Sequence, residues 1–276
     1  MRLAMLLLLL ASGVASATPK RWETLPLPPE MPIAATTGHV DVKDAKIYYA
    51  TYGKGAPVIL LHGGLGNSDH WAFQVPDLAK HYQVIVIDSR NQGRSTFAAT
   101  KVTYHAMAAD VLAVMDELGL KAAAFVGWSD GGEIALDLAV NNPARVTKLF
   151  VFGANYDAKG SKPRTGTSTT FASYASKCRS DFAKISKNPK QYAAVIASLN
   201  PVWTTAVIFT KAQLRSIQAP AVIADGDHDE IIELDQIKEM AQLIPNAKLV
   251  VFPNTSHFAL WQDPAAFNQA VLEFLR

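Results

Sequence analysis

The chain has 276 residues, of which 49% are hydrophobic and 18% charged, and its formal net charge is +2. This balance is typical of one ordinary globular domain with a single large core, and it excludes a disordered or fibrous chain. Because no basic run or stripe stands out, the sequence gives no support to nucleic acid as a partner.

The first segment of the chain is predicted to be a secretory signal peptide, residues 1–17. Arg2 supplies a positive start, residues 3–11 are an apolar run, and Ala15-Ser16-Ala17 is a cleavage pattern. The apolar run is much shorter than the about 20 residues that a transmembrane helix needs. We therefore expect an exported protein, periplasmic or secreted, with no stable membrane anchor after cleavage.

A proline-rich leader follows at residues 18–37 and is expected to lie extended on the surface, or to be partly disordered. Export implies an oxidising compartment, but Cys178 is the one cysteine of the sequence, so no intrachain disulfide can form. Cys178 falls on an apolar helical stripe, where we expect it to pack and not to act as a nucleophile.

Short apolar runs alternate with longer amphipathic ones from residue 38 onward. The runs 40–42 and 47–52 are predicted to pair as antiparallel strands. Runs typical of strands buried on both faces follow at 58–61, 84–87, 122–126, 149–152, 222–224 and 249–252. Helical patterns occur at 104–118, 131–141, 234–243 and 264–275. The alternation predicts an α/β fold, a mostly parallel sheet covered by helices on both faces.

Residues 155–210 break this alternation, because no buried-strand pattern occurs between about residues 154 and 210. A polar stretch leads into two amphipathic helical patterns, one with Phe171, Tyr174 and Cys178 on its apolar face and the next with Tyr192 and Leu199. Both stripes need something to cover. We interpret the segment as a small helical cap inserted between the two parts of the core, 38–154 and 211–276.

The strongest local motif is Gly127-Trp128-Ser129-Asp130-Gly131, which follows a predicted strand and opens a predicted helix. In that context G-x-S-x-G is a nucleophile elbow, whose glycines let the backbone turn sharply and hold the serine hydroxyl clear of the sheet. The spacing lacks the lysine and the longer glycine interval of a phosphate-binding loop. Ser129 is therefore the candidate nucleophile.

A serine nucleophile needs a base, and histidine, which titrates near about pH 6.5, suits that role. His257 follows the last predicted strand, at the carboxyl edge of the sheet where the elbow also lies. Four other histidines, His39, His70, His81 and His105, are expected to be solvated. The base needs a carboxylate to orient it. Asp229 is our first choice, with Asp227 in reserve and Asp157 as a weaker candidate, and metal binding by this acidic loop is not expected.

An oxyanion hole is expected to complete the site. One backbone N–H would come from Asp130, and the other from the glycine-rich segment after the strand 58–61, with Gly64 as first choice and Leu65 in reserve. Candidate walls of the substrate pocket are aromatic side chains of the motif and the cap: Trp128, Phe171, Tyr174, Trp203 and Phe209.

These motifs resemble those of the α/β-hydrolase superfamily, over essentially all of residues 38–276. HGG at 62–64, DSRNQGRS at 88–95, GWSDGG at 127–132, GDHD at 226–229 and SH at 256–257 occur in the family order. The family's G-x-x-D motif falls on Gly226 and Asp229, which favours Asp229 over Asp227. Asn91 and Ser256 stand where the family usually has glycine. GWSDGG is similar to the biphenyl-hydrolase-like branch, which includes amino-acid ester hydrolases. For Asp130, we favour local hydrogen bonds of its carboxylate over contact with a substrate ammonium.

The sequence as a whole predicts a serine hydrolase that cleaves carboxylic esters with small or medium acyl groups, without a cofactor. Its expected partner is a small ester-like molecule. The alternatives on the same site are amide, lactone or carbon–carbon bond hydrolysis, or perhydrolysis that needs no cofactor. An Asp nucleophile, which haloalkane dehalogenases and epoxide hydrolases require, is not present at position 129. The alternative of another class is a binding protein that kept the fold without catalysis.

Overall fold

The computed structural model describes residues 19–163 and 168–276, and the predicted signal peptide lies outside these ranges. One eight-stranded sheet runs through the molecule in the order β1-β2-β4-β3-β5-β6-β7-β8. The strands are β1 (Thr36–Val42), β2 (Ala45–Tyr52), β3 (Pro57–Leu61), β4 (Gln83–Ile87), β5 (Ala123–Trp128), β6 (Val146–Phe152), β7 (Ala221–Gly226) and β8 (Ala247–Phe252). The first two are antiparallel to their neighbours, and β3 to β8 are parallel. The predicted fold class is confirmed.

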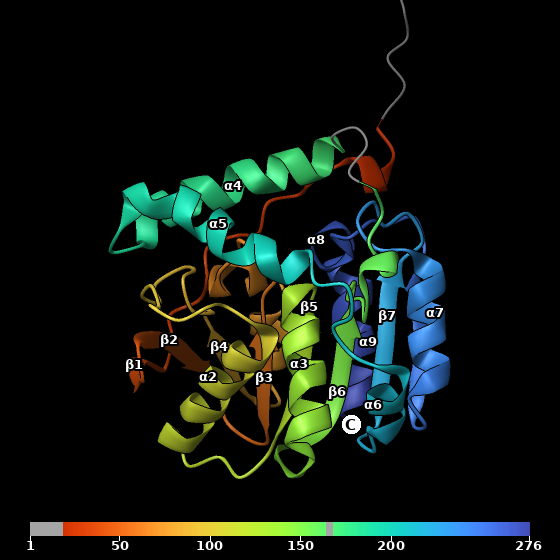
Figure 1. The fold of residues 1–276 in the computed structure, drawn as a ribbon, viewed down its shortest axis with the longest axis horizontal. Helices are drawn as coiled ribbons and strands as arrows, with labels where there is room; N and C mark the ends of the chain where they lie inside the picture. The colour runs from red at the N-terminus through yellow and green to blue at the C-terminus, as the bar shows by residue number, and fades with distance from the viewer. Residues whose placement is uncertain (1–18, 164–167) are drawn as a thin grey trace, which may run out of the picture.

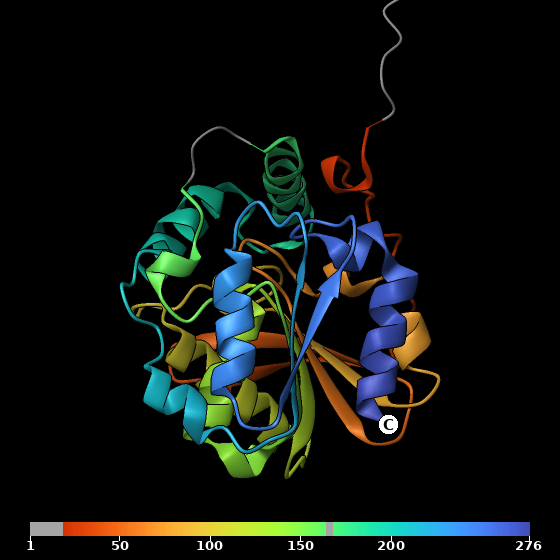
Figure 2. The ribbon, with the colours of Figure 1, turned by 90° about the vertical axis from the view of Figure 1, so that its right-hand side faces the viewer.

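Helices cover both faces of the sheet (Figures 1 and 2). On one face α2 (Tyr104–Glu117), α3 (Asp130–Asn141), α6 (Lys211–Ser216) and α7 (Leu234–Leu243) contact one another in that order. The other face carries α1 (Val75–Leu78), α8 (Ala259–Gln262) and α9 (Pro264–Leu275), and Figure 2 shows α7 and α9 on opposite sides of the strands. The short helices α1 and α8 escaped sequence prediction because four residues hold too little periodicity.

Capping side chains determine the residues at which several helices begin. The Thr103 hydroxyl accepts a hydrogen bond from the Ala106 N–H at the start of α2, and the Asp263 carboxylate does the same for Ala266 at the start of α9. Thr210 and Gln213 form the predicted capping box at the start of α6. Such caps satisfy N–H groups that have no partner inside the helix, which fixes where each helix begins.

The last strand corrects one prediction. Residues 249–252 were expected to form a strand buried on both faces, but β8 is the edge of the sheet, and Leu249 is 42% exposed. An edge strand has one neighbour and is less completely covered. A continuous apolar run therefore does not distinguish an edge strand from a central one.

Two further helices, α4 (Thr169–Ile185) and α5 (Tyr192–Trp203), lie across one end of the sheet (Figure 1). Their apolar stripes face inward: Tyr174, Cys178 and Phe182 of α4 and Leu199 of α5 are buried. The pair forms a roof over the loops that follow β3 and β5. Within the described ranges, no helix combines the length and apolar character needed to cross a membrane.

Residues 21–24 of the proline-rich leader pack against side chains that follow β7 and β8. Trp22 stacks on the His228 ring at 3.7 Å between centroids, and Arg21 forms an ion pair with Asp263. The backbone oxygen of Thr24 accepts a hydrogen bond from the Gln262 amide. These contacts hold residues 21–24 beside the loops that follow β7 and β8.

Candidate active site

Ser129 occupies a sharp turn between β5 and α3. Its φ of 54° and ψ of −125° lie outside the regions that side chains other than glycine commonly adopt. The turn is crowded: a Cβ at Gly127 would lie 2.2 Å from the Gly131 oxygen, and a Cβ at Gly131 would lie 2.0 Å from the Leu61 oxygen. The Ser129 N–H donates to the Phe152 oxygen of β6 at 2.9 Å, which anchors the strained residue. The glycines of the motif thus permit the strand–turn–helix contact.

His257 and Asp229 come together from the loops after β8 and β7. The His257 Nδ1 atom is 2.6 Å from the Asp229 Oδ2 atom, and the two side chains are 5% and 1% exposed. The His257 oxygen accepts a hydrogen bond from the Trp128 indole at 3.0 Å, which ties the histidine loop to the residue before Ser129. His257 and Ser129 line the same cavity.

The Asp229 carboxylate is surrounded by donors. Its Oδ1 atom accepts from the Ile231 and Ile232 N–H groups at 2.5 and 2.8 Å, while Oδ2 faces His257. Burial disfavours the charged form of Asp229, but the neighbouring His257 and these hydrogen bonds outweigh burial and lower the pKa of its carboxyl group. Burial likewise opposes protonation of His257, but the Asp229 charge raises the pKa of the imidazole above its ordinary value of 6.5.

The two reserve carboxylates lie elsewhere. Asp227 Oδ1 is 2.7 Å from the Nδ1 atom of its neighbour His228. Asp157 caps a 3₁₀ turn by accepting from the Lys159 N–H, and it also accepts from the Gln236 amide. Neither is brought to His257, so the geometry singles out Asp229.

The candidate oxyanion donors lie beside Ser129. Asp130 is the first residue of α3, where backbone N–H groups point out of the helix. Gly64 lines the same cavity, and its oxygen accepts a hydrogen bond from the Tyr174 hydroxyl at 2.8 Å. The reserve residue, Leu65, also lines the cavity and has a φ of 67°. The arrangement can present backbone donors to a carbonyl bound at Ser129.

The Asp130 carboxylate is engaged locally. It accepts hydrogen bonds from the Trp203 indole at 2.9 and 3.1 Å and from the Tyr104 hydroxyl at 3.1 Å. This agrees with the expectation that its side chain makes local hydrogen bonds. Each candidate oxyanion residue is therefore held by one aromatic side chain of the roof, Gly64 by Tyr174 and Asp130 by Trp203.

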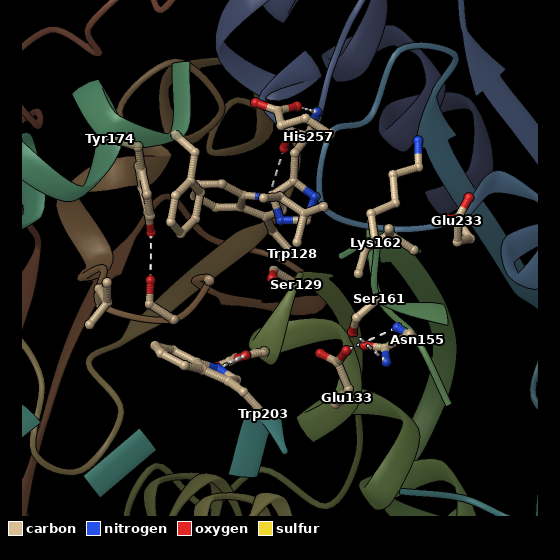
Figure 3. Close-up of a pocket in the computed structure, with 18 of the residues that line it drawn as sticks. Trp128, Ser129, Glu133, Asn155, Ser161, Lys162, Tyr174, Trp203, Glu233 and His257 are labelled. Carbon is tan, nitrogen blue, oxygen red and sulfur yellow. Dashed lines mark hydrogen bonds between the residues drawn. The ribbon is translucent and has the colours of Figure 1, made fainter. Parts of the chain in front are cut away.

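The cavity around Ser129 has a volume of about 830 Å³ and two chemically different walls. Trp203 and Tyr174 lie on one side of Ser129, and Asn155, Lys162 and Glu233 lie on the other (Figure 3). Four predicted wall residues, Trp128, Phe171, Tyr174 and Trp203, line this cavity. Phe209 does not: it is buried and lines a separate, smaller cavity beside His105 and Pro201, so its prediction is wrong. Phe209 follows α5 and turns toward α2.

Several polar residues that line the cavity were not identified from the sequence. These are Tyr104, Glu133, Asn155, Ser161, Lys162, Glu230 and Glu233. Glu133 is 2% exposed, its Oε1 atom accepts from the Asn155 N–H at 2.9 Å, and burial raises the pKa of its carboxyl well above the usual range. A carboxyl group on the buried face of a helix was a signal available in the sequence. Lys162 lies in a polar stretch that is typical of a solvated loop, so the sequence pattern does not mark it as a cavity residue.

His70 also differs from expectation. Its ring is fully buried, with Nε2 3.2 Å from Asp181 of α4, because α4 covers the loop after β3. Burial lowers the pKa of His70. Cys178 lies buried in the same roof, where burial raises the pKa of its thiol, as a packing role requires.

The two departures from the family pattern have a local explanation. Asn91 has a φ of 66°, a conformation in which glycine is common and asparagine is tolerated. Ser256 is 1% exposed, and its hydroxyl accepts from the Gln262 amide at 3.0 Å. Both residues shape loops and leave Ser129, His257 and Asp229 in place.

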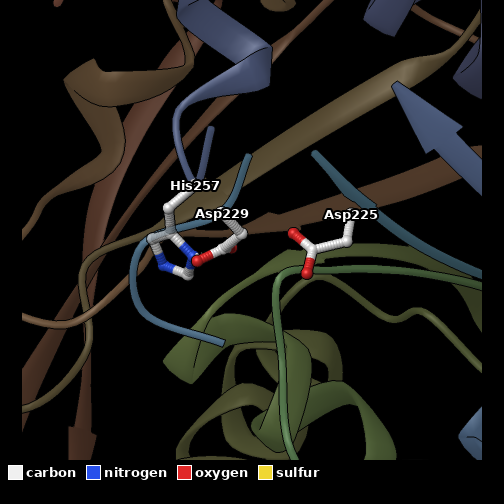
Figure 4. A group of neighbouring side chains, drawn as sticks. All are labelled: Asp225, Asp229 and His257. Carbon is white, nitrogen blue, oxygen red and sulfur yellow. Dashed lines mark hydrogen bonds and ion pairs between the residues drawn. The ribbon is translucent and has the colours of Figure 1, made fainter. Parts of the chain in front are cut away.

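Among the residues that the structure describes, one group of side chains has atoms close enough to hold a metal ion. One ligand atom each of Asp225, Asp229 and His257 lies within 4.8 Å of the others. The His257–Asp229 hydrogen bond already uses the facing atoms of two of them. The set therefore fits a hydrogen-bonded dyad with a second carboxyl group behind it (Figure 4).

Comparisons with known proteins agree with this fold. The family model for the alpha/beta hydrolase fold matches residues 56–199 and 155–264. The 2-hydroxy-6-oxo-6-phenylhexa-2,4-dienoate hydrolase of Burkholderia cepacia is 27% identical over 87% of this chain and 94% of its own. A non-heme haloperoxidase of Rhodococcus erythropolis is 29% identical over 83% and 96%. The solved structure of Est816, an N-acyl homoserine lactone degrading enzyme, is 29% identical, covers 86% of this chain and all of that one (100%), and has a TM-score of 0.68. Because the family model spans most of the sequence, this chain belongs to the α/β hydrolase fold family.

Proposed function

We propose that this protein is a serine hydrolase that cleaves carboxylic esters with small or medium acyl groups. The observation that carries the proposal is that the strained Ser129 lines the same cavity as His257, whose Nδ1 atom is 2.6 Å from the buried Asp229. A serine hydroxyl is a weak nucleophile until a base accepts its proton, and such a base needs an oriented partner.

The reaction proceeds in two steps. Ser129 Oγ attacks the ester carbonyl while His257 Nε2 accepts its proton, and the N–H groups of Asp130 and Gly64 stabilise the oxyanion. The ester bond breaks, and His257 returns the proton to the departing alcohol. Water then attacks the acyl group on Ser129, with His257 again taking and returning one proton, which releases the acid and restores the serine. Asp229 keeps the imidazole oriented and stabilises its charged form.

The charges of the cavity favour a neutral substrate. Among the described residues, three carboxyl side chains besides the protonated Glu133 line it, those of Asp130, Glu230 and Glu233, against one lysine, Lys162. A substrate carboxylate would meet this excess of acidic groups in a partly buried site, where repulsion is poorly screened. This counts against the dienoate type of substrate that names the Burkholderia relative. The aromatic wall suits an apolar acyl group.

Lactone hydrolysis is the second candidate. A lactone is a cyclic carboxylic ester, so the same acyl-enzyme chemistry opens it. The Est816 structure, 29% identical, belongs to an enzyme that degrades N-acyl homoserine lactones. On the polar wall here, the Lys162 ammonium offers a donor to an amide beside a lactone ring.

A substrate panel separates these possibilities. Wild-type protein and Ser129→Ala are assayed with p-nitrophenyl acetate, butyrate and octanoate, with an N-acyl homoserine lactone, and with the matching p-nitroanilide amides. Turnover of the short esters that is lost in Ser129→Ala supports the proposal, and faster turnover of the lactone favours the second candidate. A folded wild-type protein without turnover of any ester or lactone would refute both and favour a binding protein.

The Asp130 carboxylate offers a further discrimination. If it binds a substrate ammonium, Asp130→Asn reduces turnover of an alanine ester more than turnover of a neutral ester. If it makes local hydrogen bonds, such as those with Trp203 and Tyr104, and does not contact the substrate, the ratio of the two rates stays unchanged.

We also propose that the protein is exported. The support is the sequence of residues 1–17, which carries the three parts of a signal peptide. Expression of the full chain in a bacterium, followed by N-terminal sequencing of the product, tests this. A product that begins at Thr18 in the periplasm or medium supports export, and an uncleaved cytoplasmic product contradicts it.

A further inference from the structure

A second carboxyl group lies behind the His257–Asp229 dyad. Asp225 stands near the end of β7, four residues before Asp229, and its side chain is fully buried. Its Oδ1 atom accepts a hydrogen bond from the Gly226 N–H at 2.8 Å. Its Oδ2 atom is also buried, and no donor reaches it from the described ranges. Figure 4 shows the Asp225 carboxyl group turned toward Asp229, which lies between it and His257.

Two carboxyl groups this close cannot both carry a charge. Their facing atoms belong to a group whose members all lie within 4.8 Å of one another, in a site that water does not reach. In such pairs one carboxyl group keeps its proton, because burial and mutual repulsion both oppose a second charge.

The surroundings decide which of the two keeps the proton. Asp229 accepts hydrogen bonds from His257 and from two backbone N–H groups, of Ile231 and Ile232, whereas Asp225 accepts one, from Gly226. The positive charge facing the pair is Lys162, whose ammonium donates to the Asp229 backbone oxygen at 2.5 Å. More donors stabilise a carboxylate at Asp229, so the proton belongs on Asp225.

We propose that Asp225 is a positioning residue, an inference that rests on the proposed function. Its protonated carboxyl group donates a hydrogen bond to Asp229, which keeps Asp229 ionised and directed at His257. The proton stays on Asp225 throughout the reaction, and the bond is made and kept in the resting protein. An unpaired Oδ2 atom of a buried acid thereby gains a partner.

The directions in which burial and the neighbouring groups shift the two pKa values agree with this assignment. Burial raises the pKa of Asp225 well above the usual range, and the charge of Asp229 raises it further. Burial acts in the same direction on Asp229, but His257 and the hydrogen bond from Asp225 reverse the effect and lower the pKa of Asp229. Lys162 acts against protonation of Asp225 without overcoming burial.

Two substitutions at this position separate the possible roles. Asp225→Ala removes the donor, and we expect kcat/KM for the best ester to fall about 10- to 100-fold, as for loss of a hydrogen bond to a charged group. Asp225→Asn keeps a donor of similar shape and is expected to restore kcat/KM to within about threefold of wild type. Asp227→Asn, on the same loop but directed at His228, serves as the matched control and is expected to leave kcat/KM unchanged.

The pH profile reports the charge of Asp225 directly. If Asp225 is neutral in the wild-type protein, Asp225→Asn leaves the acidic limb of kcat/KM, which reports His257, at the same pH. If Asp225 is ionised, the same change removes a negative charge near the imidazole and moves that limb to lower pH by about one to two units. Such a shift would overturn the proposal, as would an Asp225→Asn variant no more active than Asp225→Ala.

A failure of the proposed function is distinguishable from a failure of this inference. A wild-type protein that neither hydrolyses esters nor reacts with a fluorophosphonate removes the function itself. With an active wild type, Asp225→Ala that loses thermal stability but keeps its kcat/KM and pH profile shows a purely structural role and overturns the inference. If Asp225→Ala does not fold, the comparison of Asp225→Asn with wild type across pH still decides.

Discussion

Removal of one hydroxyl group from the roof should slow catalysis without weakening substrate binding. Tyr174 is 3% exposed, and its hydroxyl donates to the Gly64 oxygen at 2.8 Å. Gly64 is the proposed second oxyanion donor. Tyr174→Phe keeps the ring and its packing but leaves that backbone oxygen unpaired, so the segment that carries the Gly64 N–H is held less firmly.

The loss of transition-state stabilisation expected in Tyr174→Phe lies between two limits. A neutral hydrogen bond contributes about 0.5–1.5 kcal/mol, and complete loss of an oxyanion donor costs about 2.7–4 kcal/mol. Because the Gly64 N–H remains and only its support is lost, we expect the lower range. With about 1.4 kcal/mol for each factor of ten, kcat should fall roughly 3- to 10-fold. KM should stay constant, since the oxyanion forms only after binding.

The assay is steady-state hydrolysis of p-nitrophenyl butyrate by wild type, Tyr174→Phe and Tyr192→Phe. Tyr192 is the matched control, because its hydroxyl donates to the Ala175 oxygen inside the roof at 3.4 Å and does not reach Gly64. An unchanged kcat in Tyr174→Phe, or equal losses in both variants, would refute the link between the roof and the oxyanion loop. A rise in KM alone would place Tyr174 in substrate binding instead.

Three further predictions concern buried groups near Ser129. Burial opposes protonation of His257, but Asp229 raises the pKa of its imidazole above 6.5, so kcat/KM should fall as the pH drops through a value above 6.5. An acidic limb of the wild-type profile below pH 6.5 would contradict this. Asp229→Asn should lower kcat by about 10⁴-fold. Gly153 has a φ of 62°, and a Cβ at this position would lie 2.9 Å from His257 Cε1. Gly153→Ala should therefore reduce kcat about tenfold or more, while circular dichroism shows an intact fold. A fully active variant would contradict the geometry. Burial raises the pKa of Glu133 in the folded state, so the stabilisation from its protonated form is present below the unfolded-state pKa and is lost as the pH rises. Glu133→Gln should therefore increase the free energy of unfolding at pH 7.5 but not at about pH 4. An equal effect at the two pH values would show that Glu133 is ionised in the fold.

The sequence predicted the parts of this molecule whose signals are local. Buried parallel strands announce themselves as continuous β-branched runs, and the elbow combines a short motif with its flanking strand and helix. The parallel strands then carry Ser129, Asp229 and His257 to one edge of the sheet, because the carboxyl ends of parallel strands meet there. Asp229 is the first choice from its place after a predicted strand, the family spacing supports it, and the structure brings Asp229, and not Asp227, to His257.

The parts that could not be predicted depend on what covers them. His70 lies in a short 3₁₀ turn and Asp225 near the end of β7, where a polar loop begins, and only the packing of α4 and of the surrounding strands makes them buried. Phe209 and Trp203 both belong to the end of the inserted segment, but the chain direction after α5 sends one away from Ser129 and the other toward it. Periodicity shows that a helix has an apolar face and does not show which residue faces the cavity.

The role of Ser129 as nucleophile is tested by locating the covalent adduct that a fluorophosphonate forms with the protein. Mature wild-type protein is labelled, digested and examined by peptide mass spectrometry, with Ser129→Ala labelled in parallel. If Ser129 is the nucleophile, the wild type carries one stoichiometric adduct on Ser129, the variant carries none, and ester turnover is lost in proportion to labelling. An adduct on another residue, or full ester turnover by a protein labelled at Ser129, would contradict Ser129 as the nucleophile.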